Sequence, residues 1–102
     1  MIASRGLAAH EAGADLVPWD FERREVGPGD VHIAISHSGV CHSDIHLVRG
    51  DWGDQEFPVV PGHEIVGEVV AVGSDVTDFS VGDRAGVGVY VDSCRECANC
   101  VA

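Results

Sequence analysis

Residues 64–73 constrain the fold more than any other stretch of this chain. They read Glu-Ile-Val-Gly-Glu-Val-Val-Ala-Val-Gly, a nearly continuous series of β-branched residues. Such a run is typical of a strand that is packed on both faces or that belongs to a barrel. Because a glycine inside a strand often marks an irregularity, we expect a bend or bulge at Gly67.

Other segments also favour strands. In residues 31–37, Val, Ile and Ile alternate with His32, Ala and Ser. This period of two predicts a half-buried strand in which His32 points outward. A Gly-Pro-Gly-Asp sequence at residues 27–30 predicts the turn before it, and a Val-Gly-Asp turn precedes a further strand expected over residues 84–91.

The remaining segments carry weaker signals. Residues 16–26 are expected to be an extended edge segment, because Pro18 disfavours a helix. A strand within residues 2–9 is left open, since its periodicity is weak. Short strands, frequent glycine turns and little helix together predict a mainly β fold, a small β-barrel with one or two short helices.

One short helix is expected after the first cysteine. Ser43 is a candidate N-cap for a helix from about Asp44 to Arg49, and Gly50 is a natural end for it. The segment that follows, residues 51–60, is rich in Gly and Pro and is expected to be a loop.

Size and charge limit the function classes. The 102 residues suffice for one small domain with a modest core. With 17 acidic against 6 basic residues, the formal net charge is −11, which argues against nucleic acid and anionic membrane surfaces as partners. No segment has the apolar length of a membrane helix or a signal peptide, so we expect a cytoplasmic protein with reduced thiols.

The cysteines and one histidine suggest metal binding. Cys41 and His63 lie 22 residues apart in loop-like contexts, and thiolate and imidazole are ligands that zinc prefers. The alternative for Cys41 is a small buried apolar residue. Cys94, Cys97 and Cys100 form a Cys-x-x-Cys-x-x-Cys run, which in a reducing compartment indicates metal binding rather than disulfides.

Four motifs in order resemble a known family. They are Gly39-Val-Cys-His-Ser-Asp-Ile-His46, Pro61-Gly-His-Glu-Ile-Val-Gly67, Val81-Gly-Asp-Arg-Ala-Gly86 and the three-cysteine run. From about Gly27 onward the chain resembles the catalytic domain of zinc-dependent medium-chain alcohol dehydrogenases. The strings Pro-Val-Val-Pro-Gly-His-Glu and Val-Asp-Ser-Cys resemble the cinnamyl alcohol dehydrogenase branch. The resemblance implies a GroES-like barrel, in agreement with the strand pattern.

The resemblance also implies a catalytic zinc site. Cys41 and His63 match two ligands, and the family completes the site with a second cysteine from further along the chain. Glu64 lies next to the metal and approaches it when the water position is vacant; the alternative is an ordinary charge at the start of a strand. Asp44 matches a carboxylate that orients His63, against the alternative of a favourable charge in the first turn of a helix.

Further roles are implied for the segment around the helix. Ser43 and His46 match a proton relay, with a helix cap and an exposed helix histidine as the alternatives. His42 occupies the place of a basic residue that contacts the cofactor pyrophosphate. Trp52 matches a wall of the substrate pocket, although a tryptophan is also a common core residue.

Cys94, Cys97 and Cys100 match three of the four cysteine ligands of a structural zinc. The implied parent enzyme oxidises a primary alcohol to an aldehyde with NAD or NADP, acts on small-molecule alcohols or aldehydes and forms a homo-oligomer.

The sequence contains no Gly-x-Gly-x-x-Gly fingerprint. We therefore expect residues 1–102 to be a single GroES-like catalytic domain, incomplete at its C-terminal end, without the nucleotide-binding Rossmann domain and inactive alone. The competing hypothesis is a non-catalytic zinc-binding fragment or interaction module.

Overall fold

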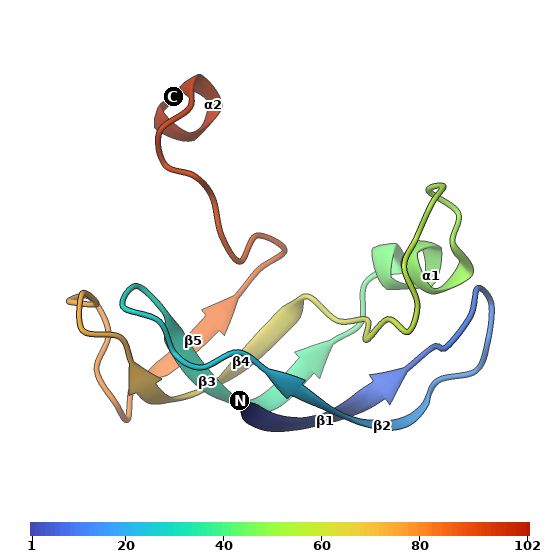
Figure 1. Cartoon of the computed structure of the whole chain (residues 1–102), viewed down its shortest axis with the longest axis horizontal. Helices are drawn as coiled ribbons and strands as arrows, with labels where there is room; N and C mark the ends of the chain where they lie inside the picture. The colour runs from blue at the N-terminus through green and yellow to red at the C-terminus, as the bar shows by residue number, and fades with distance from the viewer.

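The computed structural model describes all of residues 1–102 and contains five strands and two short helices (Figure 1). In chain order the elements are β1 (Ile2–Ala8), β2 (Val17–Arg23), β3 (Val31–Gly39), α1 (His42–Arg49), β4 (Glu64–Val72), β5 (Arg84–Val87) and α2 (Ala98–Val101). The predicted mainly β fold is confirmed. Neither helix is long and apolar enough to cross a membrane.

The strands form two antiparallel sheets. One is the hairpin β1–β2, and the other has the strand order β3–β4–β5. Ala9 and Val59 connect the end of β1 to the loop before β4 through two backbone hydrogen bonds of 2.9 Å. The strand left open at residues 2–9 is therefore present, and the expected edge segment forms β2.

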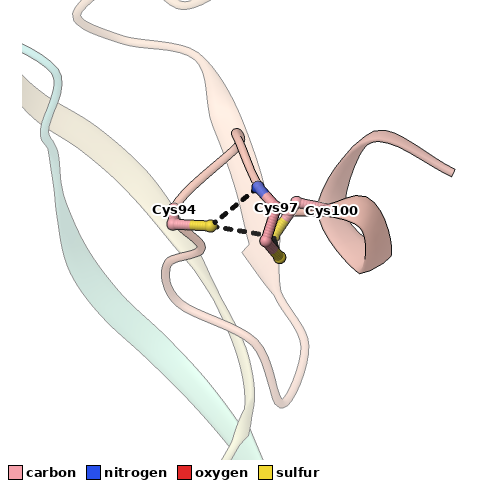
Figure 2. Close-up of side chains that lie close together, drawn as sticks. All are labelled: Cys94, Cys97 and Cys100. Atoms are coloured by element: carbon pink, nitrogen blue, oxygen red, sulfur yellow. Dashed lines mark hydrogen bonds between the residues drawn. The ribbon is translucent and has the colours of Figure 1, made fainter.

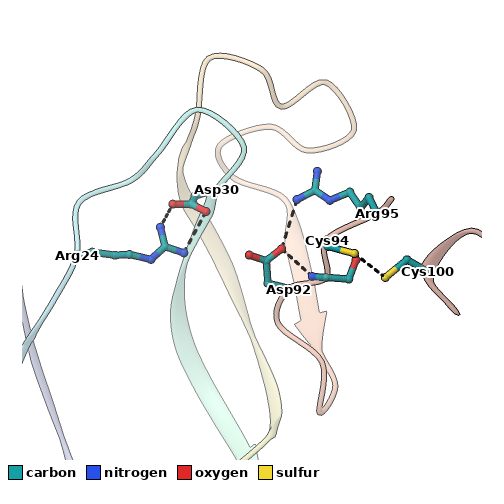
Figure 3. A network of polar contacts seen from close by, with 7 residues as sticks. Arg24, Asp30, Asp92, Cys94, Arg95 and Cys100 are labelled. Atoms are coloured by element: carbon teal, nitrogen blue, oxygen red, sulfur yellow. Dashed lines mark hydrogen bonds and ion pairs between the residues drawn. The ribbon is translucent and has the colours of Figure 1, made fainter. Parts of the chain in front are cut away.

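The turn before β3 has the predicted form. The N–H of Asp30 donates to the carbonyl of Gly27 over 3.1 Å, and the N–H of Gly27 donates to the Asp30 carboxylate over 2.8 Å. Arg24 pairs with the same carboxylate (Figure 3). Two hydrogen bonds between Gly27 and Asp30, one in each direction, thus hold this turn before the chain enters β3.

The pairing of β3 with β4 contains two irregularities. The register between β3 and β4 shifts between His32 and Ile33 and again between Ile35 and His37. At the first shift Val70 of β4 has no partner, and at the second Ser36 of β3 has none, directly after the pair between Ile35 and Gly67, so an irregularity lies next to Gly67 as expected. The simple alternation was wrong: Ile35 is 58% exposed, and His32 is half-buried rather than outward.

The last strand is shorter than predicted. The expected strand over residues 84–91 ends at Val87, which pairs with Ile65. Since β4 begins at Glu64, it offers almost no backbone beyond that pair to continue the ladder. Residues 88–102 instead leave the sheet, and the segment that ends in α2 projects away from it (Figure 1).

The interior is small for a chain of this length. Its buried apolar residues are Ala8, Ala9, Val69 and Ala85. The accessible surface of 7551 Å² exceeds the roughly 5,500 Å² typical of a compact protein of this mass. The Cα radius of gyration is 15.3 Å, against about 13 Å for a compact chain. Accordingly, the two sheets do not close into a barrel within these residues.

Gly67 is the position where the strand pairing tolerates no side chain. A Cβ atom there would lie 2.2 Å from the carbonyl oxygen of Ala34. We expect Gly67→Ala to destabilise the fold by about 3 kcal/mol, the upper end of the usual cost of overpacking. Thermal unfolding followed by circular dichroism measures this. Gly88→Ala is the matched control, because a Cβ atom there meets nothing within 4 Å; equal melting temperatures for the two variants would contradict the prediction.

Candidate metal centres

Helix α1 places the first group of candidate residues. Its N-cap is Cys41, in an extended conformation with φ −118° and ψ 154°, and Gly50 ends it with φ 71°. The end at Gly50 was predicted, but Ser43 as the N-cap was wrong. The helix begins two residues earlier than expected, and the N–H and hydroxyl of Ser43 lie against the sulfur of Cys41.

Two loops hold α1 in place. On one side, the N–H of Gly13, in the β1–β2 connection, donates to the carbonyl of Val48 over 2.9 Å. On the other side, the N–H of Gly62 donates to a carboxylate oxygen of Asp44 over 3.1 Å. Figure 1 shows the helix beside both loops, at one end of the sheets.

Asp44 joins the helix to the segment before β4. One of its oxygens accepts the N–H of Cys41 over 3.1 Å. The other accepts the N–H of Gly62 and lies 3.2 Å from Nδ1 of His63. Asp44 is only 8% exposed, and it is the one buried charged residue. It therefore has the position of a first-turn helix charge and that of a carboxylate that orients His63, so the two interpretations of Asp44 are compatible.

Cys41, His63 and Glu64 come together. Their candidate ligand atoms all lie within 4.8 Å of one another. Two glycines make this possible. Gly62 has φ 119°, which side chains rarely adopt, and a Cβ atom on Gly39 would lie 2.5 Å from Oε2 of Glu64. The chain thus needs glycine both to turn before His63 and to leave room for Glu64.

The surroundings of Cys41 and His63 shift the pKa values of both side chains. The backbone N–H of Ser43, its hydroxyl and then His63 lower the pKa of Cys41. The hydrogen bond to Cys41 raises the pKa of His63, and the charge of Asp44 raises it further. The lowered pKa makes the thiolate of Cys41, which is the form that binds metals, easier to form than that of an unperturbed cysteine. When Nδ1–H of His63 donates to Asp44, Nε2 carries the lone pair that a metal requires.

These donors fit a zinc ion. Zinc binds sulfur at about 2.3 Å and nitrogen or carboxylate oxygen at about 2.0–2.2 Å, in a tetrahedron. In such a tetrahedron the ligand atoms lie less than 4.8 Å from one another. The candidate ligand atoms of the cluster already lie within 4.8 Å of one another, so they are close to the spacing that zinc requires. Cys41, His63 and Glu64 offer one sulfur, one nitrogen and one oxygen, which is a suitable donor set for zinc.

A second group lies along α1 and the loop after it. Nδ1 of His46 is 2.9 Å from a carboxylate oxygen of Asp51. The His46 ring is 4.9 Å from the ring of His42 and 5.4 Å from that of Trp52, measured between centroids. Trp52 is 65% exposed, so the alternative of a core tryptophan was wrong. No direct hydrogen bond joins Ser43 to His46.

Sequence reasoning missed Asp51. It follows the C-cap Gly50 directly, five positions after His46. The sequence signal that could have found it is an acidic residue directly after a helix-ending glycine, where the chain folds back over the last turn of the helix. The structure shows this fold-back, since the N–H of Asp51 donates to the carbonyl of His46 over 3.0 Å.

The three later cysteines form a separate cluster (Figure 2). The sulfur of Cys100 lies 3.5 Å from that of Cys94 and 3.4 Å from that of Cys97. The N–H of Cys97 donates to the sulfur of Cys94 over 3.3 Å. All three thiols are free and exposed, and three thiolates this close suit a zinc ion.

The chain before this cluster is organised by Asp92, as Figure 3 shows. Its carboxylate accepts the N–H of Ser93 over 2.8 Å and pairs with Arg95 over 3.4 Å. Arg95 has φ 63°, so the backbone turns sharply between Cys94 and Cys97. This turn helps to direct backbone N–H groups at the sulfur of Cys94.

We expect this turn to affect the reactivity of Cys94. Hydrogen bonds from the backbone N–H groups of Glu96 and Cys97, and then from the neighbouring thiols, lower the pKa of Cys94 to about 6. Its reactive thiolate is thus present above pH 6 and is lost below it. In the chelator-treated chain, alkylation of Cys94 by iodoacetamide, measured by mass spectrometry, should reach half its maximal rate near this pH. In urea the midpoint should rise toward about 8.5, the value for an unperturbed thiol; the same midpoint in both states would contradict the prediction.

Known proteins are similar to this chain in sequence and in fold. Residues 27–102 match the family described as the alcohol dehydrogenase GroES-like domain. The chain is 57% identical over 95 residues to NADP-dependent alcohol dehydrogenase C 1 of Mycolicibacterium smegmatis. The aligned region covers 93% of this chain and 27% of that protein.

Solved structures give the same result. A cinnamyl alcohol dehydrogenase from Sorghum bicolor superposes with a TM-score of 0.92 at 46% identity, over 97% of this chain and 28% of that one. A cobalt- and zinc-bound thermostable alcohol dehydrogenase from Pyrobaculum aerophilum superposes with a TM-score of 0.80 at 31% identity, over 97% of this chain and 30% of that one.

The chain therefore belongs to the alcohol dehydrogenase GroES-like domain family. The predicted resemblance to zinc-dependent and cinnamyl alcohol dehydrogenases is confirmed. The chain spans about a quarter of the length of the known relatives that it matches.

Proposed function

We propose that this chain is the zinc-binding catalytic domain of an NAD(P)-dependent alcohol dehydrogenase, which interconverts a primary alcohol and its aldehyde. The observation that carries the proposal is the convergence of Cys41, His63 and Glu64, held by Asp44. Membership of the family and similarity to an NADP-dependent enzyme support it, and the latter favours NADP over NAD.

In this proposal Cys41 and His63 hold the catalytic zinc, and Glu64 is a nearby third donor. When bound, zinc would supply Lewis acidity at the substrate oxygen, and a nicotinamide cofactor would supply the hydride chemistry. Asp44 fixes the tautomer of His63 by accepting its Nδ1 proton. The same carboxylate holds the backbone of Cys41, so both ligands depend on one buried group.

The residues along α1 handle the proton and the cofactor. Ser43 receives the alcohol proton, and His46 passes it to solvent with Asp51 behind its Nδ1. Since no hydrogen bond joins Ser43 to His46, the relay requires a group of the substrate, the cofactor or water between them. His42, the first residue of the helix, contacts the cofactor pyrophosphate, where the helix dipole also favours an anion. Trp52 lines the substrate side of His46.

The remaining assignments complete the proposal. Cys94, Cys97 and Cys100 hold a structural zinc together with a fourth ligand. The whole enzyme is cytoplasmic and homo-oligomeric and acts on a small alcohol or aldehyde. Its acidic surface makes nucleic acid and anionic membranes unfavourable partners.

Residues 1–102 alone should show no NAD(P)-dependent oxidation of benzyl, cinnamyl or aliphatic alcohols. Hydride transfer depends on a positioned cofactor, and a misplacement of about 1 Å already costs on the order of a hundredfold in rate. A chimera that joins this chain to the remainder of the Mycolicibacterium smegmatis relative should be active, measured by NADPH absorbance. A chimera that folds and binds zinc but stays inactive would favour the competing hypothesis, a non-catalytic zinc-binding module.

A further inference from the structure

The exposed side of α1 carries two histidines one turn apart. His42 and His46 stand in an i, i+4 relation, which places them on the same face of the helix. Their ring centroids are 4.9 Å apart, and the ring planes are inclined by 63°. The rings are therefore neighbours that do not stack.

The surroundings of His46 prepare one of its nitrogens as a ligand. Nδ1 lies 2.9 Å from the carboxylate of Asp51. In the tautomer in which Nδ1–H donates to this carboxylate, Nε2 carries the free lone pair. A carboxylate behind a histidine is the arrangement that orients metal-binding imidazoles and raises their basicity.

Two histidines at i and i+4 on one helix face can bind one metal ion, because their nitrogens converge above the same turn. Imidazole suits zinc, copper and nickel, whereas Mg²⁺ and Ca²⁺ prefer oxygen. We propose that His42 and His46 form a second binding site for a divalent transition-metal ion, backed by Asp51 and separate from the Cys41–His63 centre.

This site has a consequence for the proposed enzyme. An ion there would occupy Nε2 of His46 and the ring of His42, so that neither could move a proton or contact the cofactor. Excess transition metal would then inhibit the enzyme. This inhibition rests on the proposed function, whereas metal binding rests only on the geometry of His42, His46 and Asp51.

Trp52 provides a built-in probe. Its ring lies 5.4 Å from that of His46, within range of fluorescence quenching by bound Ni²⁺. Trp19→Phe removes the other tryptophan. Serine in place of Cys94, Cys97 and Cys100 removes thiol sites that are exposed and lie outside the sheets.

The experiment is a Ni²⁺ titration of the full chain with these four substitutions. We expect saturable quenching of Trp52, and a loss of affinity of at least about tenfold in both His42→Gln and His46→Gln, since even an outer partner of a ligand contributes that much. His37→Gln, an exposed strand histidine, is the matched control and should bind as before. Circular dichroism checks that the variants stay folded.

Three outcomes would overturn the proposal. The first is no quenching at millimolar Ni²⁺, and the second is quenching that both His42→Gln and His46→Gln leave unchanged. The third is a nickel–thiolate absorption band that rises with the quenching, because in this background the only remaining thiol is Cys41.

Discussion

Cys41→Ala and His63→Ala are each expected to reduce alcohol oxidation by the chimera below detection. Either change removes one of the donors that converge near the end of β3 and the start of β4. With too few ligands left, zinc is lost, and with it the polarisation of the substrate oxygen. Steady-state kinetics together with elemental analysis of the purified variants measure both effects.

Two graded controls belong to this experiment. Ser43→Ala should slow turnover by about 10²- to 10⁴-fold, the usual contribution of a positioned proton-transfer group, while zinc content stays unchanged. Asp44→Asn should lower activity or zinc affinity by about 10- to 100-fold, as for other carboxylates behind a metal-bound histidine. The two carboxylate oxygens of Asp44 accept the N–H groups of Cys41 and Gly62 separately, and the single amide oxygen of Asn can replace only one of them, so this variant tests the carboxylate as a whole.

The pattern of losses is what distinguishes the assignments. A chimera that keeps its activity after Cys41→Ala would show that the catalytic metal lies elsewhere. Zinc loss in Ser43→Ala equal to that in Cys41→Ala would instead assign Ser43 to the integrity of the site, through its contacts with the Cys41 sulfur.

The purified chain of 102 residues is expected to hold fewer than two zinc ions and to lose them to mild chelation. The Cys41 cluster offers one sulfur, one nitrogen and one carboxylate oxygen, and the second cluster offers three thiols. Structural zinc sites are closed tetrahedra, so three thiols leave one position to solvent. Elemental analysis before and after dialysis against a chelator measures the occupancy.

The two clusters can be separated by substitution. Serine at Cys94, Cys97 and Cys100 leaves Cys41 as the only thiol ligand, and the zinc content that withstands chelation should fall below one ion per chain. Two ions retained per chain after chelation would contradict the prediction, unless sedimentation shows a dimer in which ligands are shared.

Several features of the fold were accessible from local patterns. The β-branched run of residues 64–73 predicted β4, and the Gly-Pro-Gly-Asp turn predicted the start of β3. Gly50 predicted the end of α1. These features depend on backbone preferences and side-chain spacing within a few residues, and such preferences are present in the sequence itself.

Other features depend on what each strand meets. The extent of β5 was overestimated because its apolar residues continue past Val87, whereas the partner strand does not. The burial of Ile35 was misjudged because the pairing of β3 with β4 is irregular on both sides of this residue, with Val70 and Ser36 left without partners. The length of the partner strand and the position of a register shift depend on residues outside the strand, so the sequence of the strand alone does not predict them.

The sequence by itself determined the strand-rich fold, the family and the residue types able to bind zinc, since these follow from local pattern and from side-chain chemistry. Only the tertiary structure decided that Asp44 joins Cys41 to the segment at Gly62, and that Asp51 lies behind His46. The physical reason is that such contacts form where loops close and helices pack against neighbouring segments. Asp44 and Gly62 are 18 positions apart, and their hydrogen bond exists only once α1 is held beside the start of β4.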